Sequence, residues 1–193
     1  MESKESILAA IKKNKPEANP LPLLPDFPYK DNLIEQFQES LTLNGGKSLV
    51  ISDLKEVMAY LKENYSDTQM LVSLVEGVEG NYDISLAEDP HDLEPVEVAI
   101  LEGVWGAAEN AAIWLPEENL IHRVLPFIAQ HLVVLLKKSR VMGNMHEVYH
   151  AIDVAASGYG VLIAGPSKTA DIEQSLIIGA HGPRSMTVFL IEG

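Results

Sequence analysis

Residues 161–191 read VLIAGPSKTADIEQSLIIGAHGPRSMTVFLI and hold the chain's densest mixture of Gly, Pro, hydroxyl, carboxylate, His and Arg residues. An apolar run opens the stretch, and an alternating apolar run closes it. Between them lie two turns, residues 165–169 and 179–184, and a carboxylate-bearing segment, residues 171–173. Apolar runs bounded by such turns predict β-strands. Because open α/β sheets bind ligands at strand ends, the two turns are also the first candidate site.

Strand-like runs alternate with amphipathic helices over the rest of the chain. Residues 131–136 form an uninterrupted apolar run, which is typical of a strand covered on both faces. Apolar side chains at helical spacing predict helices over residues 33–41 and 54–61, and Asn144 can cap a third over residues 145–155. The other predicted strands are residues 48–51, 69–75, 96–101 and 111–115. This alternation predicts an α/β fold in three layers, with one sheet covered on both faces.

The beginning of the chain differs from the remainder, and we divide the sequence into residues 1–46 and a domain over residues 47–193. The first part opens with a predicted short helix whose apolar face holds Ile7, Leu8 and Ile11. Five prolines within residues 16–28 then predict an extended arm, because proline is disfavoured inside helices. The arm's large apolar side chains are expected to pack on the domain or on a neighbouring subunit of a homo-oligomer: Leu21, Leu23, Leu24 and Phe27.

Composition excludes several classes of protein. The net charge is −14, and no Lys or Arg occurs between Lys62 and Arg123, so a nucleic-acid partner and an anionic membrane surface are not expected. The chain contains no Cys, which excludes disulfides, thiolate nucleophiles and Cys-ligated iron–sulfur clusters on this chain. The first residues lack the layout of a signal peptide, and the most apolar stretch, residues 120–136, includes charged and polar side chains. We therefore expect a cytoplasmic protein with no cofactor of its own.

The first turn allows two interpretations. We expect a helix to begin near Thr169, where free backbone N–H groups can hold an anion together with the hydroxyl of Ser167. Thr169 can equally be a plain N-cap, with Asp171 and Glu173 placed to complement the helix dipole. Spacing alone favours the capping interpretation, because such capping is common at helix starts.

The second turn carries His181 and Arg184 between Gly residues and a strand. Histidine is the side chain best suited to proton transfer near neutral pH, and arginine can bind a carboxylate with two parallel hydrogen bonds. A His that hydrogen-bonds the turn and an Arg paired with a local acid explain the same residues.

Glu109 stands between two strand-like runs among small residues. A carboxylate in such surroundings is expected to be functional or paired, since an unpaired buried charge is costly. Arg123, the first basic residue after a long acidic tract, is one candidate partner, and a purely structural Glu109–Arg123 pair is the competing interpretation.

Residues 146–150, HEVYH, match a zinc-binding pattern in which His146 and His150 share a helix face and Glu147 is a general base. Glu173 is a conceivable third ligand. The small residues that follow favour an ordinary sheet-covering helix, so we expect no metal here and keep a zinc hydrolase as a remote alternative.

Three segments together carry a family resemblance. Residues 165–173, GPSKTADIE, followed by Gly179-x-His181-Gly182-Pro183 and an alternating strand, resemble the LUD domain of the lactate utilization protein C (LutC) family. Residues 108–109 resemble the start of that family's Ala-Glu-Thr-Gly segment, although Asn110 and Ala111 replace the Thr and Gly. Residues 123–126, RVLP, resemble its Arg-x-Leu-Pro segment. The resemblance covers roughly residues 48–193.

The resemblance implies a fold similar to the NagB/RpiA/CoA-transferase-like group, which includes glucosamine-6-phosphate deaminase and ribose-5-phosphate isomerase. It implies an accessory role in the oxidation of L-lactate to pyruvate, alongside LutA/LutB-like proteins that carry the iron–sulfur clusters. It leaves open whether this chain catalyses a step. An alternative is a CoA-transferase-like acyl transfer, in which Glu109 attacks an acyl-CoA as a covalent nucleophile.

The resulting site hypothesis is one pocket for a small carboxylate or phosphorylated ligand. We expect Glu109, His181 and Asp171 to handle protons. The expected ligand-binding residues are Arg123, which would hold the anion, and Ser167, Thr169, Glu173 and Arg184.

Overall fold

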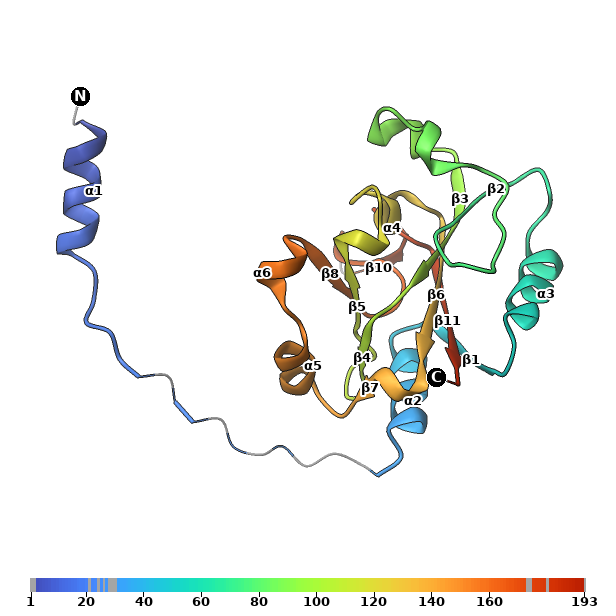
Figure 1. Ribbon diagram of the computed structural model, residues 1–193, viewed down its shortest axis with the longest axis horizontal. Coiled ribbons are helices and arrows are strands. Elements are labelled where there is room, and N and C mark those ends of the chain that lie inside the picture. Colours follow the sequence, from blue (N-terminus) through green and yellow to red (C-terminus); the bar gives the residue numbers. More distant parts are fainter. Residues whose placement is uncertain are drawn as a thin grey trace.

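The computed structural model describes residues 3–20, 22–23, 25, 27, 31–172, 175–179 and 181–192, with only the backbone described for residues 170–172 and 175–177. All the described strands belong to one body, and helix α1 precedes that body in the sequence (Figure 1). The candidate site belongs to the body.

The body is built around a five-stranded parallel sheet. Its strand order is β1-β11-β6-β3-β2, and every neighbouring pair runs parallel. The strands are β1 (Lys47–Ile51), β2 (Met70–Ser73), β3 (Val96–Glu102), β6 (His131–Lys137) and β11 (Ser185–Ile191). Five successive residues are buried in β6 and again in β11. Strands of a parallel sheet are apolar on both faces because both faces are covered, so the predicted buried strands are confirmed.

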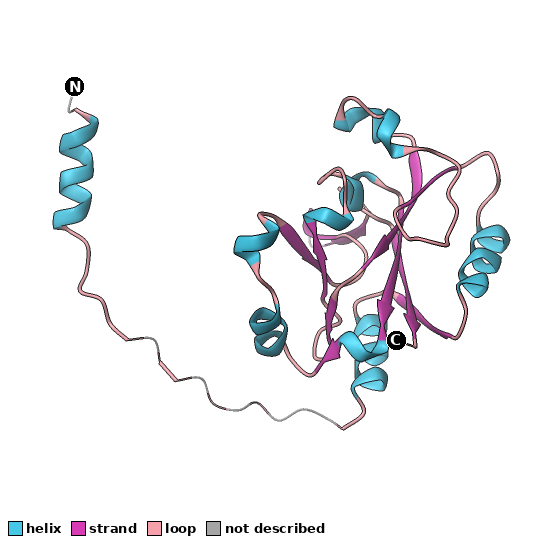
Figure 2. Ribbon diagram, viewed as in Figure 1, coloured by secondary structure: helices cyan, strands magenta, loops and turns pink. Residues whose placement is uncertain are grey.

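Each face of this sheet has its own apolar core. Along β6, Leu132, Val134 and Leu136 belong to one core, whereas Val133 and Leu135 belong to the other. Helix α3 (Leu54–Asn64) covers the second core, and helix α2 (Leu33–Leu43) buries part of its surface in the first. Figure 2 shows helices on both sides of the sheet, which confirms the predicted layered α/β fold.

A second, smaller sheet contributes to the layer over the first core. Its order is β7-β4-β5-β8, formed by β7 (Val141–Met142), β4 (Trp105–Ala107), β5 (Ile113–Pro116) and β8 (Gly160–Ile163). Ile113 and Leu115 are completely buried in the first core. This layer is therefore part sheet and part helix, and β8 leads directly into the first candidate turn.

The expected helix near Thr169 is wrong. Strand β9 (Lys168–Ile172) pairs antiparallel with β10 (Ser175–Ile178), with Thr169 opposite Ile177. A β-branched residue at this position suits a strand, and the backbone groups that a helix start would leave free are in a ladder. Glu173 lies outside the described residues.

The single helix expected over residues 145–155 is two helices. Helix α5 (Met145–Ala151) ends at Ile152, whose backbone is extended, and α6 (Val154–Ser157) begins after Asp153. The Asp153 side chain accepts a hydrogen bond from the N–H of Ala156, so it caps a new helix instead of continuing the old one.

The remaining helical segments are short. They are α4 (Leu125–Ile128) and the 3₁₀ turns η1 (Ile84–Leu86), η2 (Pro90–Leu93), η3 (Glu117–Asn119) and η4 (Lys138–Arg140). Nowhere in the described part of the chain is a helix both long and apolar enough to cross a membrane.

The described residues of the N-terminal part differ in their contacts with the body. Helix α1 (Lys4–Lys13) has no buried residue, and Leu23 is 98% exposed. Phe27 stacks on the ring of His146, with the ring centroids 4.8 Å apart. Leu21 and Leu24 lie outside the described residues. Packing on the chain's own domain is therefore confirmed for Phe27, whereas Leu23 makes no such contact and its packing on a neighbouring subunit stays a prediction.

Candidate functional site

The two sequence turns meet at a pocket of about 270 Å³. Helix α4 lies on one side of it, and the end of β8 with the two turns forms the rest. The pocket is lined by Pro126, Phe127, Val161, Leu162, Ile163, Ala164, Gly165, Pro166, Ser167, His181, Gly182 and Pro183. Its volume lies just below the range of ordinary ligand pockets, so it suits a ligand of few atoms.

Ser167 joins the two turns through its backbone. Its N–H donates to the carbonyl of Pro183 over 2.9 Å, and its own carbonyl accepts from the N–H of Gly179 over 3.0 Å. A Cβ on Gly182 would lie 2.9 Å from the Ser167 Cβ, closer than side chains pack. Glycine at 182 therefore allows the turns to touch.

Gly165 fixes the first turn against helix α2. Its φ is +90°, in the left-handed region that favours glycine, and a Cβ there would lie 2.9 Å from the backbone oxygen of Asn44. Its N–H donates to the sulfur of Met186 over 3.2 Å. The first turn is thus in contact with both the end of α2 and strand β11.

Ser167 and His181 supply the polar side chains of the described lining. His181 is exposed and makes no hydrogen bond within the described part of the chain, so its ring nitrogens are available to a ligand. Phe127 and the β8 side chains are apolar parts of the described lining. The described lining includes no Lys or Arg, which favours a ligand with little charge over a phosphate.

Arg123 was expected to hold an anionic ligand, but it is absent from the described pocket lining and pairs with Glu117. Its Nε and Nη2 atoms donate to the two carboxylate oxygens of Glu117 over 2.7 and 2.9 Å, and its guanidinium lies 4.7 Å from the ring centroid of Tyr159. The hydrogen bond with Arg123 lowers the pKa of the Glu117 carboxyl. The expected Glu109–Arg123 pair is therefore wrong, because Glu117 accepts the hydrogen bonds from both Nε and Nη2 of Arg123.

Glu109 caps a helix. Its Oε1 atom accepts a hydrogen bond of 2.7 Å from the backbone N–H of Met145, the first residue of α5. A carboxylate at a helix N-terminus is stabilised by the free N–H groups and by the helix dipole. Glu109 is exposed and is absent from the described pocket lining, so the structure does not bring it together with His181 there.

Glu147, from the zinc-binding pattern of residues 146–150, makes its hydrogen bonds at the start of α5. The Glu147 carboxylate accepts from the N–H of Gly143 over 3.1 Å and from the side-chain amide of Asn144 over 3.0 Å. His146 stacks on Phe27. Among the described residues, no group of three or more His, Cys, Asp or Glu side chains is arranged to hold a metal. The zinc interpretation has no support from these contacts.

Several other predicted site residues are missing from the described pocket lining. Thr169 and the backbone of Asp171 belong to β9, beyond the pocket rim, and Glu173 lies outside the described residues. The N–H of Arg184 donates to the carbonyl of Gln130 over 2.7 Å, while its side chain is exposed. Ser167 and His181 alone among the predicted site residues are in the described lining. Phe127 was not predicted, although the Leu125–Pro126 pair beside it lies in a segment singled out from the sequence.

A sequence profile of the LUD domain matches residues 88–191, which is more than half of the chain and contains both turns, α4 and β8. The chain belongs to the LUD domain family. The predicted family resemblance is confirmed.

Named relatives of this LUD domain protein include two lactate utilization proteins C. The one from Bacillus pumilus (strain SAFR-032) is 28% identical over 118 residues, 58% of this chain and 49% of the relative. The one from Anoxybacillus flavithermus (strain DSM 21510 / WK1) is 30% identical over 104 residues, 52% of this chain and 47% of the relative. In these comparisons, the chain spans about half the length of the curated relatives it matches.

A crystal structure of a DUF162 family protein from Deinococcus radiodurans shares the fold of this LUD domain protein. The TM-score is 0.58 at 16% identity, over 82% of this chain and 96% of that one. The likeness supports the layered α/β architecture.

Proposed function

We propose that this LUD domain protein is a LutC-like accessory component of L-lactate utilization in the cytoplasm, and that it binds a small carboxylate between the two turns. The observation that carries the proposal is the pocket itself, formed by the two segments that hold the family motif and lined by Ser167 and His181. The names of its relatives, lactate utilization protein C, supply the pathway.

The chemistry of the pocket suits a small 2-hydroxy or 2-oxo acid. The Ser167 hydroxyl can donate to a carboxylate oxygen, and a ring nitrogen of His181 can bond a second oxygen or exchange a proton with it. The ring of Phe127 and the aliphatic side chains of β8 offer an apolar wall to a methyl group. A phosphorylated ligand is the weaker candidate, because no Lys or Arg lines the described part of the pocket.

In the proposed pathway, partner proteins would accept the electrons released by the oxidation of L-lactate. The chain has no Cys, so the iron–sulfur clusters that we propose for the pathway would be held by LutA/LutB-like proteins. Affinity capture of the tagged full chain from lactate-grown cells should recover a Cys-rich protein. Recovery of no such protein would count against this part of the proposal.

Ligand binding is tested by titrating L-lactate and pyruvate into the full chain in a calorimeter. His181→Ala should weaken binding about tenfold, by loss of a hydrogen bond worth about 1–2 kcal/mol. His91→Ala is a matched control, because His91 is an exposed histidine in η2 and does not line the pocket. Equal binding by the wild type and His181→Ala would remove this pocket from the proposal.

The pathway is tested by growth. A strain without the gene should grow poorly on L-lactate and normally on pyruvate. The His91→Ala gene should restore growth, and the His181→Ala gene should not. Normal growth of the deletion strain on L-lactate would contradict the assignment.

A further inference from the structure

A cluster of polar side chains lies at the amino ends of three neighbouring strands of the parallel sheet. Glu97 is near the start of β3, His131 begins β6 and Ser185 begins β11. The register of β6 and β11 places Ser185 opposite His131. Tyr65, at the end of α3, has its ring centroid 5.5 Å from that of the imidazole. Neither Ser185 nor His131 belongs to the described lining of the candidate pocket, so the cluster is a separate place on the molecule.

His131 lies between a hydroxyl and a carboxylate. Its Nδ1 atom is 2.7 Å from Oγ of Ser185, and its Nε2 atom is 3.6 Å from a carboxylate oxygen of Glu97. A negative carboxylate beside Nε2 favours the tautomer that carries its proton there. Nδ1 is then a free acceptor for the hydroxyl proton of Ser185. A serine hydroxyl bonded to an imidazole that a carboxylate orients is the arrangement that activates serine as a nucleophile.

The side chains of this cluster are only partly covered. Those of His131 and Glu97 are 26% and 33% exposed, and Ser185 is half-buried. Packing against Tyr65 limits the movement of the imidazole, whereas the remaining exposure leaves the cluster open to a small molecule from solvent. A completely buried serine would be out of reach of such a molecule.

Tyr65 supplies a hydrogen-bond donor beside the serine. Its phenol makes hydrogen bonds with Ser185 and Tyr60, and burial raises its pKa to about 12, so it keeps its proton in neutral solution. A neutral phenol can donate to the negative charge that develops on an acyl oxygen next to Ser185. Tyr65 also lines a cavity of about 160 Å³, whose apolar members include Met58 and Leu61. This volume is below that of ordinary ligand pockets and suits a short acyl chain.

We propose that Ser185 is a nucleophile for small carboxylic esters, with His131 as general base, Tyr65 as donor to the oxyanion and Glu97 as a positioning residue. The Ser185 oxygen forms a bond to the acyl carbon while its proton passes to Nδ1 of His131. The bond from the acyl carbon to the leaving alcohol then breaks, and His131 gives the proton to that alcohol oxygen. Water, the second substrate, attacks the acyl carbon in the same way, which releases a carboxylic acid and restores the serine.

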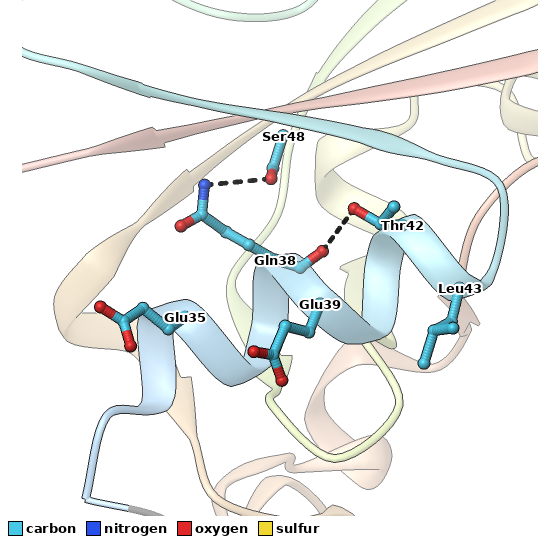
Figure 3. A pocket seen from close by; sticks show the side chains of 6 residues that line it. All are labelled: Glu35, Gln38, Glu39, Thr42, Leu43 and Ser48. Carbon is cyan, nitrogen blue, oxygen red and sulfur yellow. Dashed lines mark hydrogen bonds between the residues drawn. The ribbon is translucent and has the colours of Figure 1, made fainter.

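Ser48 of the neighbouring strand β1 is a serine of the same sheet without this arrangement. It is half-buried, as Ser185 is, and β1 pairs with β11. Its hydroxyl accepts a hydrogen bond of 3.2 Å from the side-chain amide of Gln38 (Figure 3). An amide nitrogen cannot take the proton of a hydroxyl, and no His is present in the described lining of the groove around Ser48, which consists of Glu35, Gln38, Glu39, Thr42, Leu43 and Ser48. Ser48 is therefore the matched control.

The test treats the full chain with p-nitrophenyl acetate and stops the reaction with acid. Mass spectrometry should show an added acetyl group, and peptide mapping should place it on Ser185 and not on Ser48. Ser185→Ala should abolish the adduct at this position, whereas Ser48→Ala should acetylate Ser185 at the rate of the wild type. His131→Ala should slow the acetylation at least about a hundredfold, the usual contribution of a general base.

Two further variants separate catalysis from a structural role. Tyr65→Phe should slow the acetylation at least about tenfold, by loss of a donor to the oxyanion. Glu97→Gln should slow it without a change in the midpoint of urea unfolding, because the residue orients a ring at the end of the sheet. A wild-type map without acetyl on Ser185, or with Ser48 acetylated as fast as Ser185, would overturn the proposal. So would a folded His131→Ala that reacts as fast as the wild type. None of these results bears on lactate binding at the Ser167–His181 pocket.

Discussion

Ala111 is held in a backbone conformation that alanine rarely adopts. Its φ is +56° and its side chain is completely buried. The neighbouring Asn110 fixes the turn, since its side-chain oxygen accepts from the N–H of Ala112 over 3.0 Å and its carbonyl accepts from Asn44 over 2.8 Å. A non-glycine residue in the left-handed region costs about 1–2 kcal/mol, and the LutC segment that this stretch resembles has Gly in its place.

Ala111→Gly should therefore stabilise the protein by about 0.5–1 kcal/mol, after the greater flexibility of glycine in the unfolded chain is subtracted. The midpoint of urea unfolding should rise with no change in slope. Ala112→Gly is the matched control: it is a buried neighbour without positive φ, and the change should destabilise. A lower midpoint for Ala111→Gly would show that the strain is not located at this residue.

Tyr65 has the clearest perturbed acidity. Burial, followed by the neighbouring Tyr60, raises the pKa of its phenol from 10.0 to about 12. A phenol whose folded pKa exceeds its unfolded value stays neutral longer when folded. Its stabilising contribution is complete below about pH 10 and is lost as the pH rises toward 12.

A spectroscopic titration of tyrosinate absorbance should show a component with a midpoint near pH 12. Tyr65→Phe should remove that component. Tyr149→Phe should leave it in place, because Tyr149 is 60% exposed on α5. Persistence of the late component in Tyr65→Phe would assign it to another tyrosine.

The partner of Arg123 could not be predicted from the sequence of the neighbouring residues. The sequence singled out Glu109 as a functional or paired residue, and Arg123 as an anion holder or as the partner of Glu109. The actual partner of Arg123, Glu117, depends on the turn between them, where Ile121 has a φ of +56° and reverses the chain. Positive φ in a β-branched residue has no sequence signal, so this choice of partner could not be predicted.

Helix α5 depends on a side chain from a distant strand connection. Asn144 caps it locally, and Glu109 supplies a second acceptor at the N–H of Met145. The helix has seven residues, too few to be stable alone, so its start must be fixed by such contacts.

Glu109→Ala should lower the free energy of unfolding by about 1 kcal/mol, which is typical of a lost helix cap. Chemical denaturation measures the change. Glu118→Ala, an exposed acid in η3, should have little effect. If Glu109→Ala leaves stability unchanged but abolishes formation of an adduct with acyl-CoA, the residue is a nucleophile and not a cap.

Helices and strands could be predicted from the sequence where a residue pattern was compatible with only one kind of secondary structure. The apolar runs of β6 and β11 cannot be exposed, so their burial followed from composition. Residues 168–172 offered two patterns at once, since Thr169 with two later acids suits an N-cap and its β-branched side chain suits a strand. Pairing with β10, a contact made through the backbone, decides between them. The pocket was predictable as two turns, but not the wall that α4 contributes from a separate part of the chain.

At the scale of the molecule, stability is concentrated in the middle of the parallel sheet. Phe189 of β11 is 1% exposed and contacts Tyr60 edge to face, with the centroids 5.3 Å apart. Val50 of the edge strand β1 is 48% exposed.

Phe189→Ala should cost about 3–5 kcal/mol, a large part of the total stability of an ordinary domain. Val50→Ala should cost less than about 0.5 kcal/mol. Urea titrations of both variants compare the two sites. Similar losses would mean that the edge of the sheet is as tightly packed as its middle.

The position of β11 in the sheet has a consequence for the order of assembly. The strand lies between β1 and β6, so the first and the last strand of the body must pair before the sheet is continuous. During synthesis, residues 47–51 therefore wait for residues 185–191, with no other strand to pair with in the finished five-stranded sheet. Such distant pairing slows folding and leaves apolar strands uncovered in the meantime. We expect the nascent chain to keep residues 47–51 unpaired in this sheet until residues 185–191 have been synthesised.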